Sequence, residues 1–194
     1  MQKNDFDDLF LRALAERVQI IATEASAHFS KLDNQQLNFK PADNTWSIGQ
    51  CLDHIITTNR QYFEMLKPMI SGWRDKNQVR SKPFRSGLFG NFFVNSMKPN
   101  PKRKLKSPDI FLPAQSEVTK TILNDFERNL QQVLQLLQHA DGADLNRIKV
   151  TSPVTRLIRF RLGDCFNVLV THSERHTAQA RGVLAAPQFP GGAV

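Results

Sequence analysis

The stretch SEVTKTILNDFERNLQQVLQLLQHA, residues 116–140, carries the clearest folding signal in this chain. Apolar side chains recur along it every three or four positions, at Val118, Ile122, Phe126, Leu130, Val133 and Leu137. Because an α-helix has about 3.6 residues per turn, these side chains share one face, which must be buried against other elements. Asp141 and Gly142 follow and end the pattern. The stretch therefore predicts a long amphipathic helix.

Two further segments, one near each end of the chain, show the same period. Residues 5–30 have apolar side chains at steps of three and four, and Asp5 is the expected N-cap of that helix. Helical periodicity returns from about residue 162 to 184, where Pro187 and a Gly/Pro-rich tail close it. Both segments predict long helices with one buried face.

A fourth helix is predicted from its start signal. Ser47 and Gln50 have the spacing of a capping box, and Trp46 stands at the position of a hydrophobic staple. They predict a helix over residues 47–70. Pro68 is expected to end it early, because proline lacks the N–H group that an interior helical position uses.

Residues 71–115 separate the second and third predicted helices and show no sustained period, although GLFGNFFVN within them is compatible with a short local element. Residues 148–160 alternate weakly and are expected to be extended. Four long helices and one long connection predict an all-α fold, a four-helix bundle with a long crossover between helices 2 and 3. We expect residues 1–187 to form a single domain with an insertion at 71–115, and residues 188–194 to form a flexible tail.

The positive charge is confined to that insertion. The 194-residue chain has a net charge of +8, and residues 71–115 hold ten Lys and Arg against two Asp, which accounts for all of it. Such a segment is either a solvated loop or a contact for nucleic acid or another polyanion. Two cysteines exclude a disulfide scaffold, and no apolar stretch approaches the ~18 residues of a membrane span. No secretory signal is visible, so a cytoplasmic location is expected.

Histidine is the most informative residue type. His172 and His176 stand at i and i+4, which places both rings on one face of the last helix, about 6 Å apart along its axis. They interrupt its apolar side, so each needs a buried partner. Either each ring hydrogen-bonds a neighbouring group, or both bind one metal ion. His54, beside apolar Leu52 and Ile55, completes a candidate set of three histidines across the bundle.

No catalytic acid or base is identified. The order H-S-E-R-H differs from the H-E-x-x-H of zincin proteases, and it turns Glu174 about 200° away from His172, which excludes a zincin mechanism. Asp53 adjoins His54 in sequence but lies about 100° around the helix. His28 and His139 stand near helix ends, where exposure or a dipole contact is expected.

Other polar residues keep two interpretations each. The arginines before the last helix either receive an anionic substrate or are surface charge: Arg156, Arg159 and Arg161. Cys51 and Cys165 lie one or two turns before a candidate ligand, and are either functional thiols or small buried hydrophobes.

The segments TWSIGQCLDHI, residues 45–55, and SPVTRLIRFRLGDCFNVLVTHSERHTAQARGVL, residues 152–184, resemble the DinB-like superfamily, which includes YfiT-type metal-dependent hydrolases. The resemblance implies a helical bundle that binds a divalent metal, zinc or nickel for instance, through His54, His172 and His176. Some members are similar to transferases that use low-molecular-weight thiols. The long basic insertion departs from the family pattern and leaves the substrate open.

Three functional hypotheses follow. The first is a metal-dependent hydrolase or thiol-dependent transferase acting on a small molecule, in a chain that also forms a homodimer. The second is a non-enzymatic bundle whose basic segment at 71–115 binds nucleic acid or another polyanion. The third is a structural or dimerisation bundle with a vestigial site that holds no metal.

Overall fold

The computed structural model describes residues 6–99, 107–155 and 157–191. Its elements follow in the order α1 (Leu9–Phe29), α2 (Asn34–Asn38), α3 (Ile48–Ser71), α4 (Leu88–Met97), the short 3-10 helix η1 (Asp109–Phe111), α5 (Thr121–His139), β1 (Lys149–Thr151), β2 (Arg159–Arg161) and α6 (Leu162–Leu184). Within these described ranges, no helix has both the length and the apolar character needed to cross a bilayer.

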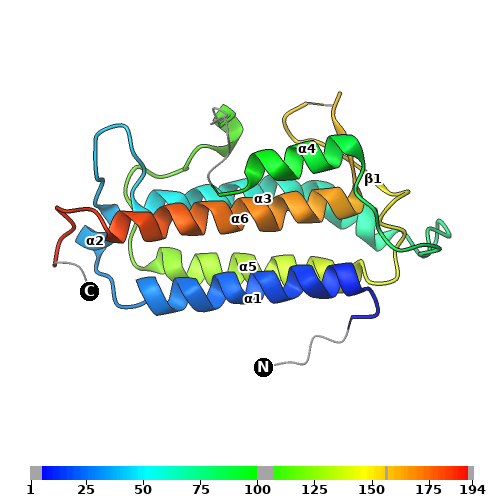
Figure 1. Cartoon of the computed structure of the whole chain (residues 1–194), viewed down its shortest axis with the longest axis horizontal. Coiled ribbons are helices and arrows are strands. Elements are labelled where there is room, and N and C mark those ends of the chain that lie inside the picture. Colours follow the sequence, from blue (N-terminus) through cyan, green and yellow to red (C-terminus); the bar gives the residue numbers. More distant parts are fainter. Residues whose placement is uncertain (1–5, 100–106, 156, 192–194) are drawn as a thin grey trace.

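The four long helices α1, α3, α5 and α6 lie side by side in two layers (Figure 1). α3 and α6 form one layer and α1 and α5 form the other, with α3 packed on α5 and α1 packed on α6 between the layers. The apolar stripe of α5 faces the shared core: Ile122, Phe126, Leu130, Val133 and Leu137 are all buried. The predicted all-α bundle with a crossover between its second and third long helices is confirmed.

The start of α1 differs from the prediction. The Asp8 carboxylate accepts hydrogen bonds from the N–H groups of Phe10 and Leu11, so Asp8 is the N-cap and the helix begins at Leu9. Asp5, the expected cap, lies outside the described residues. The N–H groups of Asp7 and Asp8 donate to the Asp141 carboxylate just beyond α5, which fixes where the chain enters the bundle.

The capping box of Ser47 and Gln50 is present and starts α3 as predicted. The expectation that Pro68 ends this helix early is wrong, because α3 continues to Ser71. Pro68 and Glu64, whose carbonyl would have received the missing N–H, both lie on the exposed side of the helix. Water can therefore take the place of the lost hydrogen bond.

The long connection between α3 and α5 contains two helices of its own. The element expected at GLFGNFFVN is α4, which packs along α6, and η1 packs against α3. The extended segment predicted over residues 148–160 forms an antiparallel hairpin in which Lys149 pairs with Arg161. The short α2 was not predicted, and its capping box between Asp33 and Gln36 is the signal that marks it.

Candidate metal centre

Three histidines from two helices meet inside the bundle. α3 supplies His54, and α6 supplies His172 and His176. The ring centroid of His54 lies 4.9 Å from that of His172 and 4.4 Å from that of His176, and the latter two are 4.5 Å apart. One ring nitrogen from each lies within 4.8 Å of the others, so the cluster could hold one metal ion.

All three imidazoles are nearly sealed from solvent, with relative exposures of 2% for His54, 8% for His172 and 7% for His176. Burial lowers the pKa of His54 to about 4 and that of His176 to about 3, and it lowers the pKa of His172 well below its ordinary value. Repulsion from the Arg175 guanidinium lowers all three further. The rings are therefore neutral at pH 7, which is the form that binds metals.

Hydrogen bonds at Nδ1 set the tautomer of two of the rings. His54 Nδ1 donates to the carbonyl of Phe111 in η1, and His176 Nδ1 donates to Gln179 Oε1 at 2.9 Å. Because both partners are oxygen acceptors, each Nδ1 carries the proton and each Nε2 has a lone pair that points away from that partner. This is the outer-shell arrangement that orients metal-binding histidines in proteins.

The third ring tests whether an ion fits. His172 Nε2 lies 3.0 Å from His54 Nε2, and its own Nδ1 is buried with no hydrogen-bond partner among the described residues. Two nitrogens on a tetrahedral zinc ion, each ~2.05 Å from it, lie about 3.3 Å apart. A separation of 3.0 Å is within a few tenths of an ångström of that value, so this pair of nitrogens fits a divalent ion, and the ligand nitrogen of His176 lies within 4.8 Å of both.

Trp46 forms one wall of the cluster. Its ring centroid lies 4.6 Å from that of His54 and 5.7 Å from that of His176. Tyr62 stacks on Phe111 at 6.1 Å and so supports η1, whose carbonyl holds His54. The aromatic surroundings keep water away from the rings, which strengthens electrostatic interactions inside the cluster.

The carboxylates nearest in sequence are occupied elsewhere. Both Glu174 oxygens accept from Arg17 on α1, at 2.7 and 2.6 Å, which confirms that Glu174 faces away from the histidines. Asp53 accepts from the N–H of Gln115 at 3.0 Å and so fixes the chain between η1 and α5. Neither belongs to the histidine cluster.

The cysteines are buried core residues. Cys51 and Cys165 are both fully enclosed, and burial raises the pKa of Cys51 to about 12. The pKa of Cys165 is raised by burial and by the neighbouring Asp164. Both remain protonated thiols at pH 7, and neither is a nucleophile in this state.

The arginines before α6 lie at the other end of that helix from the cluster. Arg161 donates to the carbonyl of Arg85 at 2.7 Å, and Arg159 is exposed on β2. Eleven residues separate Arg161 from His172, which is about 16 Å along the helix axis. Arg156 lies outside the described residues.

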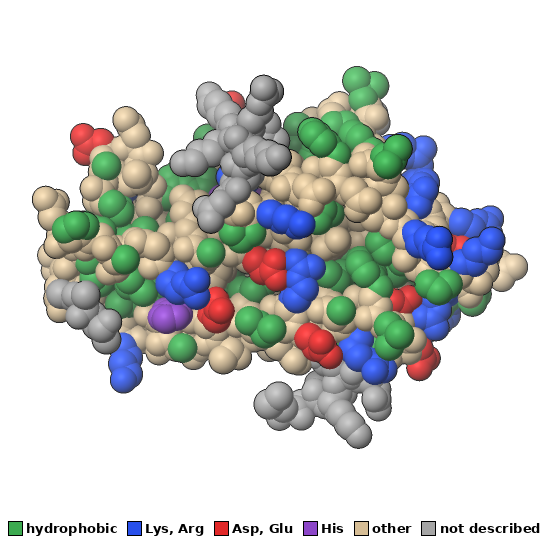
Figure 2. Space-filling view, in the orientation of Figure 1, with side chains coloured by type: hydrophobic (Ala, Val, Ile, Leu, Met, Phe, Trp, Pro, Cys, Tyr) green, Lys and Arg blue, Asp and Glu red, His purple; other side chains and the backbone are tan. Residues whose placement is uncertain are grey.

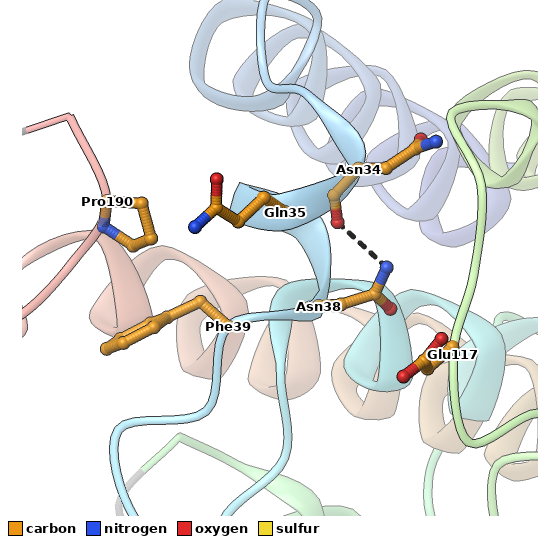
Figure 3. Close-up of a pocket in the computed structure, with 6 residues that line it drawn as sticks. All are labelled: Asn34, Gln35, Asn38, Phe39, Glu117 and Pro190. Carbon is orange, nitrogen blue, oxygen red and sulfur yellow. Dashed lines mark hydrogen bonds between the residues drawn. The ribbon is translucent and has the colours of Figure 1, made fainter.

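A separate hollow of about 460 Å³ lies beside α2 (Figure 3) and is lined by Asn34, Gln35, Asn38, Phe39, Glu117 and Pro190. None of these belongs to the histidine cluster. Asn38 donates to the carbonyl of Val118 and accepts from its N–H, both at 2.8 Å, so it clamps the chain that leads into α5. The Asn38 side chain in this hollow therefore stabilises the fold.

Sequence comparison identifies the family. The model of the DinB superfamily matches residues 19–180, a span that includes all three histidines and the long connection. The chain belongs to the DinB superfamily. No curated protein and no solved structure gave a significant match.

Three features of this DinB centre were not predicted. The Phe111 carbonyl lies in a segment without periodicity, so no sequence signal pointed to it. Trp46 was predicted only as a staple, although its position one residue before a capped helix that bears a histidine already placed it near the site. Gln179, three residues after His176, faces the same side of α6, and that spacing could have predicted its hydrogen bond.

Proposed function

We propose that this DinB protein is a metal-dependent enzyme, a hydrolase or a thiol-dependent transferase, that acts on a small molecule through zinc or nickel held by His54, His172 and His176. The observation that carries the proposal is the meeting of three neutral, buried imidazoles, two of which are fixed in the ligand tautomer by Phe111 and Gln179. Imidazole donors suit zinc and nickel better than calcium or magnesium.

Three protein ligands leave at least one position free on a four-coordinate ion. When bound, the ion supplies Lewis acidity that lowers the pKa of a water or thiol at that position. The chain itself holds the rings, excludes water through Trp46, and places the Arg175 guanidinium beside the cluster. Arg175 is kept there by a 3.2 Å hydrogen bond to the carbonyl of Ser96 on α4, and its charge would attract an anionic substrate.

The surroundings favour a thiol over water as the activated group. Asp53 and Glu174 are both engaged in other hydrogen bonds, so neither is free to serve as a general base. A thiol, with an ordinary pKa of ~8.5, needs far less acidification than water, whose pKa is ~15.7. A centre whose two neighbouring carboxylates, Asp53 and Glu174, are both engaged therefore suits a low-molecular-weight thiol.

The long connection supports the enzymatic hypothesis over pure polyanion binding. η1 supplies the carbonyl that orients His54, and α4 supplies the carbonyl that holds Arg175. Both elements come from residues 71–115. This segment therefore takes part in building the centre.

Elemental analysis of protein purified without a histidine tag tests the proposal. After incubation with zinc or nickel and removal of free ion, we expect about one ion per chain. His54→Gln should lose it, whereas His28→Gln, which changes an exposed histidine outside the cluster, should retain it. Wild-type protein that binds less than about a tenth of an equivalent, or a folded His54→Gln variant that binds as much as wild type, would overturn the proposal.

A turnover assay tests the reaction class. The zinc- or nickel-loaded protein is mixed with a small thiol and an electrophile, and loss of free thiol is followed against the His54→Gln variant. Catalysed thiol loss that needs His54 supports the transferase, whereas release of product from an ester or amide without a thiol supports the hydrolase.

A further inference from the structure

Five apolar side chains project from one end of the molecule, remote from the histidine cluster along α6. Leu88 of α4 is 93% exposed, Phe92 is 67% exposed, and Leu157 in the loop between β1 and β2 is 93% exposed. Phe89 and Val154 beside them are about half exposed, at 49% and 47%. We call these five residues the α4–hairpin surface.

The two elements of this surface are firmly joined. The rings of Phe89 and Phe93 contact Phe160 of β2, with centroids 5.9 and 5.0 Å away. Arg161 donates to the carbonyl of Arg85, just before α4. The apolar side chains of the surface therefore sit on a rigid base, and they stay exposed in the part of the chain that the structure describes.

α4 is fixed to α6 by its opposite face. Gly90 and Val94 are buried, and Gly90 lies so close to the buried Asp164 carboxylate that a Cβ there would clash with it. Asp164 also accepts a hydrogen bond from Ser86. The outward face of α4 has leucine and phenylalanine in its first half, where a solvent-exposed helix normally has charged residues.

Basic residues predominate in the two stretches of sequence that carry the α4–hairpin surface. The sequence has no Asp or Glu between Asp75 and Asp109, and none between Asp144 and Asp164. The described exposed cations in these two stretches are Lys76, Lys82, Arg85, Lys98, Arg147, Lys149 and Arg159. Asp144 and Asp164, which bound the second stretch, are both buried.

Figure 2 shows hydrophobic side chains along the edge formed by α4 and the hairpin loop, with Lys and Arg side chains next to them. The cations also influence one another. The pKa of Lys149 is lowered by burial and by the Arg161 and Arg159 guanidinium groups, and the Asp164 carboxylate offsets part of this effect. Exposed cations next to exposed leucine and phenylalanine side chains favour a partner that is both anionic and apolar.

We propose that the α4–hairpin surface binds the surface of a bilayer that contains anionic phospholipids. Leu88 and Leu157 enter the boundary between headgroups and acyl chains, while the surrounding Lys and Arg side chains contact the phosphates. The two most exposed side chains are aliphatic and stand on a helix end and a projecting loop (Figure 1), which suits insertion into lipid. Stacking on nucleic acid bases would instead need several free aromatic rings, whereas Phe89 packs on Phe160 and, of the two phenylalanines in this surface, only Phe92 is largely exposed.

Co-sedimentation with vesicles tests this proposal. Vesicles of phosphatidylcholine with about 30% phosphatidylglycerol should bind the wild-type protein at 100 mM salt, and vesicles of phosphatidylcholine alone should not. The double variant Leu88→Ser/Leu157→Ser should bind at least tenfold more weakly, and so should Arg85→Glu/Arg159→Glu. All four side chains are exposed, so circular dichroism should show an unchanged fold.

Matched controls change similar residues elsewhere. Leu9→Ser/Ile20→Ser removes two exposed apolar side chains of α1, and Lys31→Glu/Lys40→Glu removes two exposed cations; both should bind like wild type. Absence of binding to anionic vesicles, or equal losses in the controls, would overturn the proposal. So would tighter binding of a single-stranded oligonucleotide that the same charge variant abolishes. A wild-type dimer that dissociates on Leu88→Ser/Leu157→Ser would show instead that a second copy covers this surface.

Discussion

Acidification should destabilise the metal-free protein strongly, because the three clustered histidines stay neutral in the folded state. Burial lowers the pKa of His54 to about 4 and that of His176 to about 3, and the pKa of His172 falls in the same direction. The unfolded chain takes up protons at these residues below pH ~6.5, which the folded chain does not. Their contribution to the free energy of unfolding is thus fully present above pH ~6.5 and is lost as the pH falls towards the folded-state values.

The size of the effect follows from these pKa values. With a pKa of 6.5 in the unfolded chain and about 4 in the folded protein, one histidine lowers the free energy of unfolding by about 2 kcal/mol between pH 7 and pH 5. His54 and His176 together give about 4 kcal/mol, and His172 adds to this loss in the same direction. A domain has a total stability of only ~5–15 kcal/mol. Metal-free protein is therefore expected to be marginal or unfolded near pH 5.

Urea unfolding in the presence of EDTA, followed by far-UV circular dichroism between pH 7.5 and 5.5, measures this slope. Replacing His54 by Gln should remove about 1 kcal/mol of this pH dependence. Leu130→Ala, which opens a cavity in the core but leaves the histidines, should lower stability at every pH and keep the wild-type slope. A wild-type change of less than about 1 kcal/mol over this range, or an unchanged slope in His54→Gln, would refute the argument.

Three further predictions concern single contacts. Gln179→Leu removes the acceptor of His176 Nδ1 and should weaken zinc binding by about 10- to 100-fold in a competition titration, whereas Gln132→Leu on the exposed face of α5 should not. Gly49→Ala would place a Cβ 2.1 Å from Val118 Cγ2 and should lower the free energy of unfolding, measured in urea, by about 1–3 kcal/mol. Gly182→Ala has open space around it and should raise this free energy by about 0.5–1 kcal/mol through the higher helix propensity of alanine. Asn59→Ala removes the amide donor that lies 2.7 Å from the buried Asn129 side chain, and it should lower the unfolding free energy by about 1–3 kcal/mol. A larger loss of stability in Asn129→Ser than in Asn129→Ala would contradict this account.

The positions of the helices could be predicted from the sequence where local patterns determine where a helix lies or begins. The stripe of α5 and the capping box of Ser47 and Gln50 are local patterns that survive in the folded protein. The start of α1 was predicted at the wrong residue: Asp8 caps the helix through its own side chain, and its N–H also donates to Asp141, a contact over 133 residues that no local pattern shows. Pro68 was misjudged because its effect depends on which side of α3 faces water.

The histidine cluster shows the same division between local and distant information. The i, i+4 spacing places His172 and His176 together, and the position of His54 beside Leu52 and Ile55 added the third candidate, which the family resemblance also implied. The hydrogen bond that fixes the His54 tautomer comes from a main-chain carbonyl, and any residue type at position 111 would offer the same oxygen. Sequence letters can therefore predict ligands, but they do not predict which backbone group orients them.

The connection between α3 and α5 is the part of the fold that joins these observations. It supplies η1 to orient His54, α4 to hold Arg175, and, at its other end, the exposed leucine and phenylalanine of the α4–hairpin surface. α4 is a single short helix whose C-terminal end touches the centre and whose N-terminal end carries the lipid-facing side chains. Ser96 lies about two helical turns after Leu88, so a bilayer that binds Leu88 and shifts or steadies α4 would also shift or steady the carbonyl that holds Arg175. Metal affinity measured with and without anionic vesicles would reveal that coupling, and by linkage the metal should then change vesicle binding by the same factor.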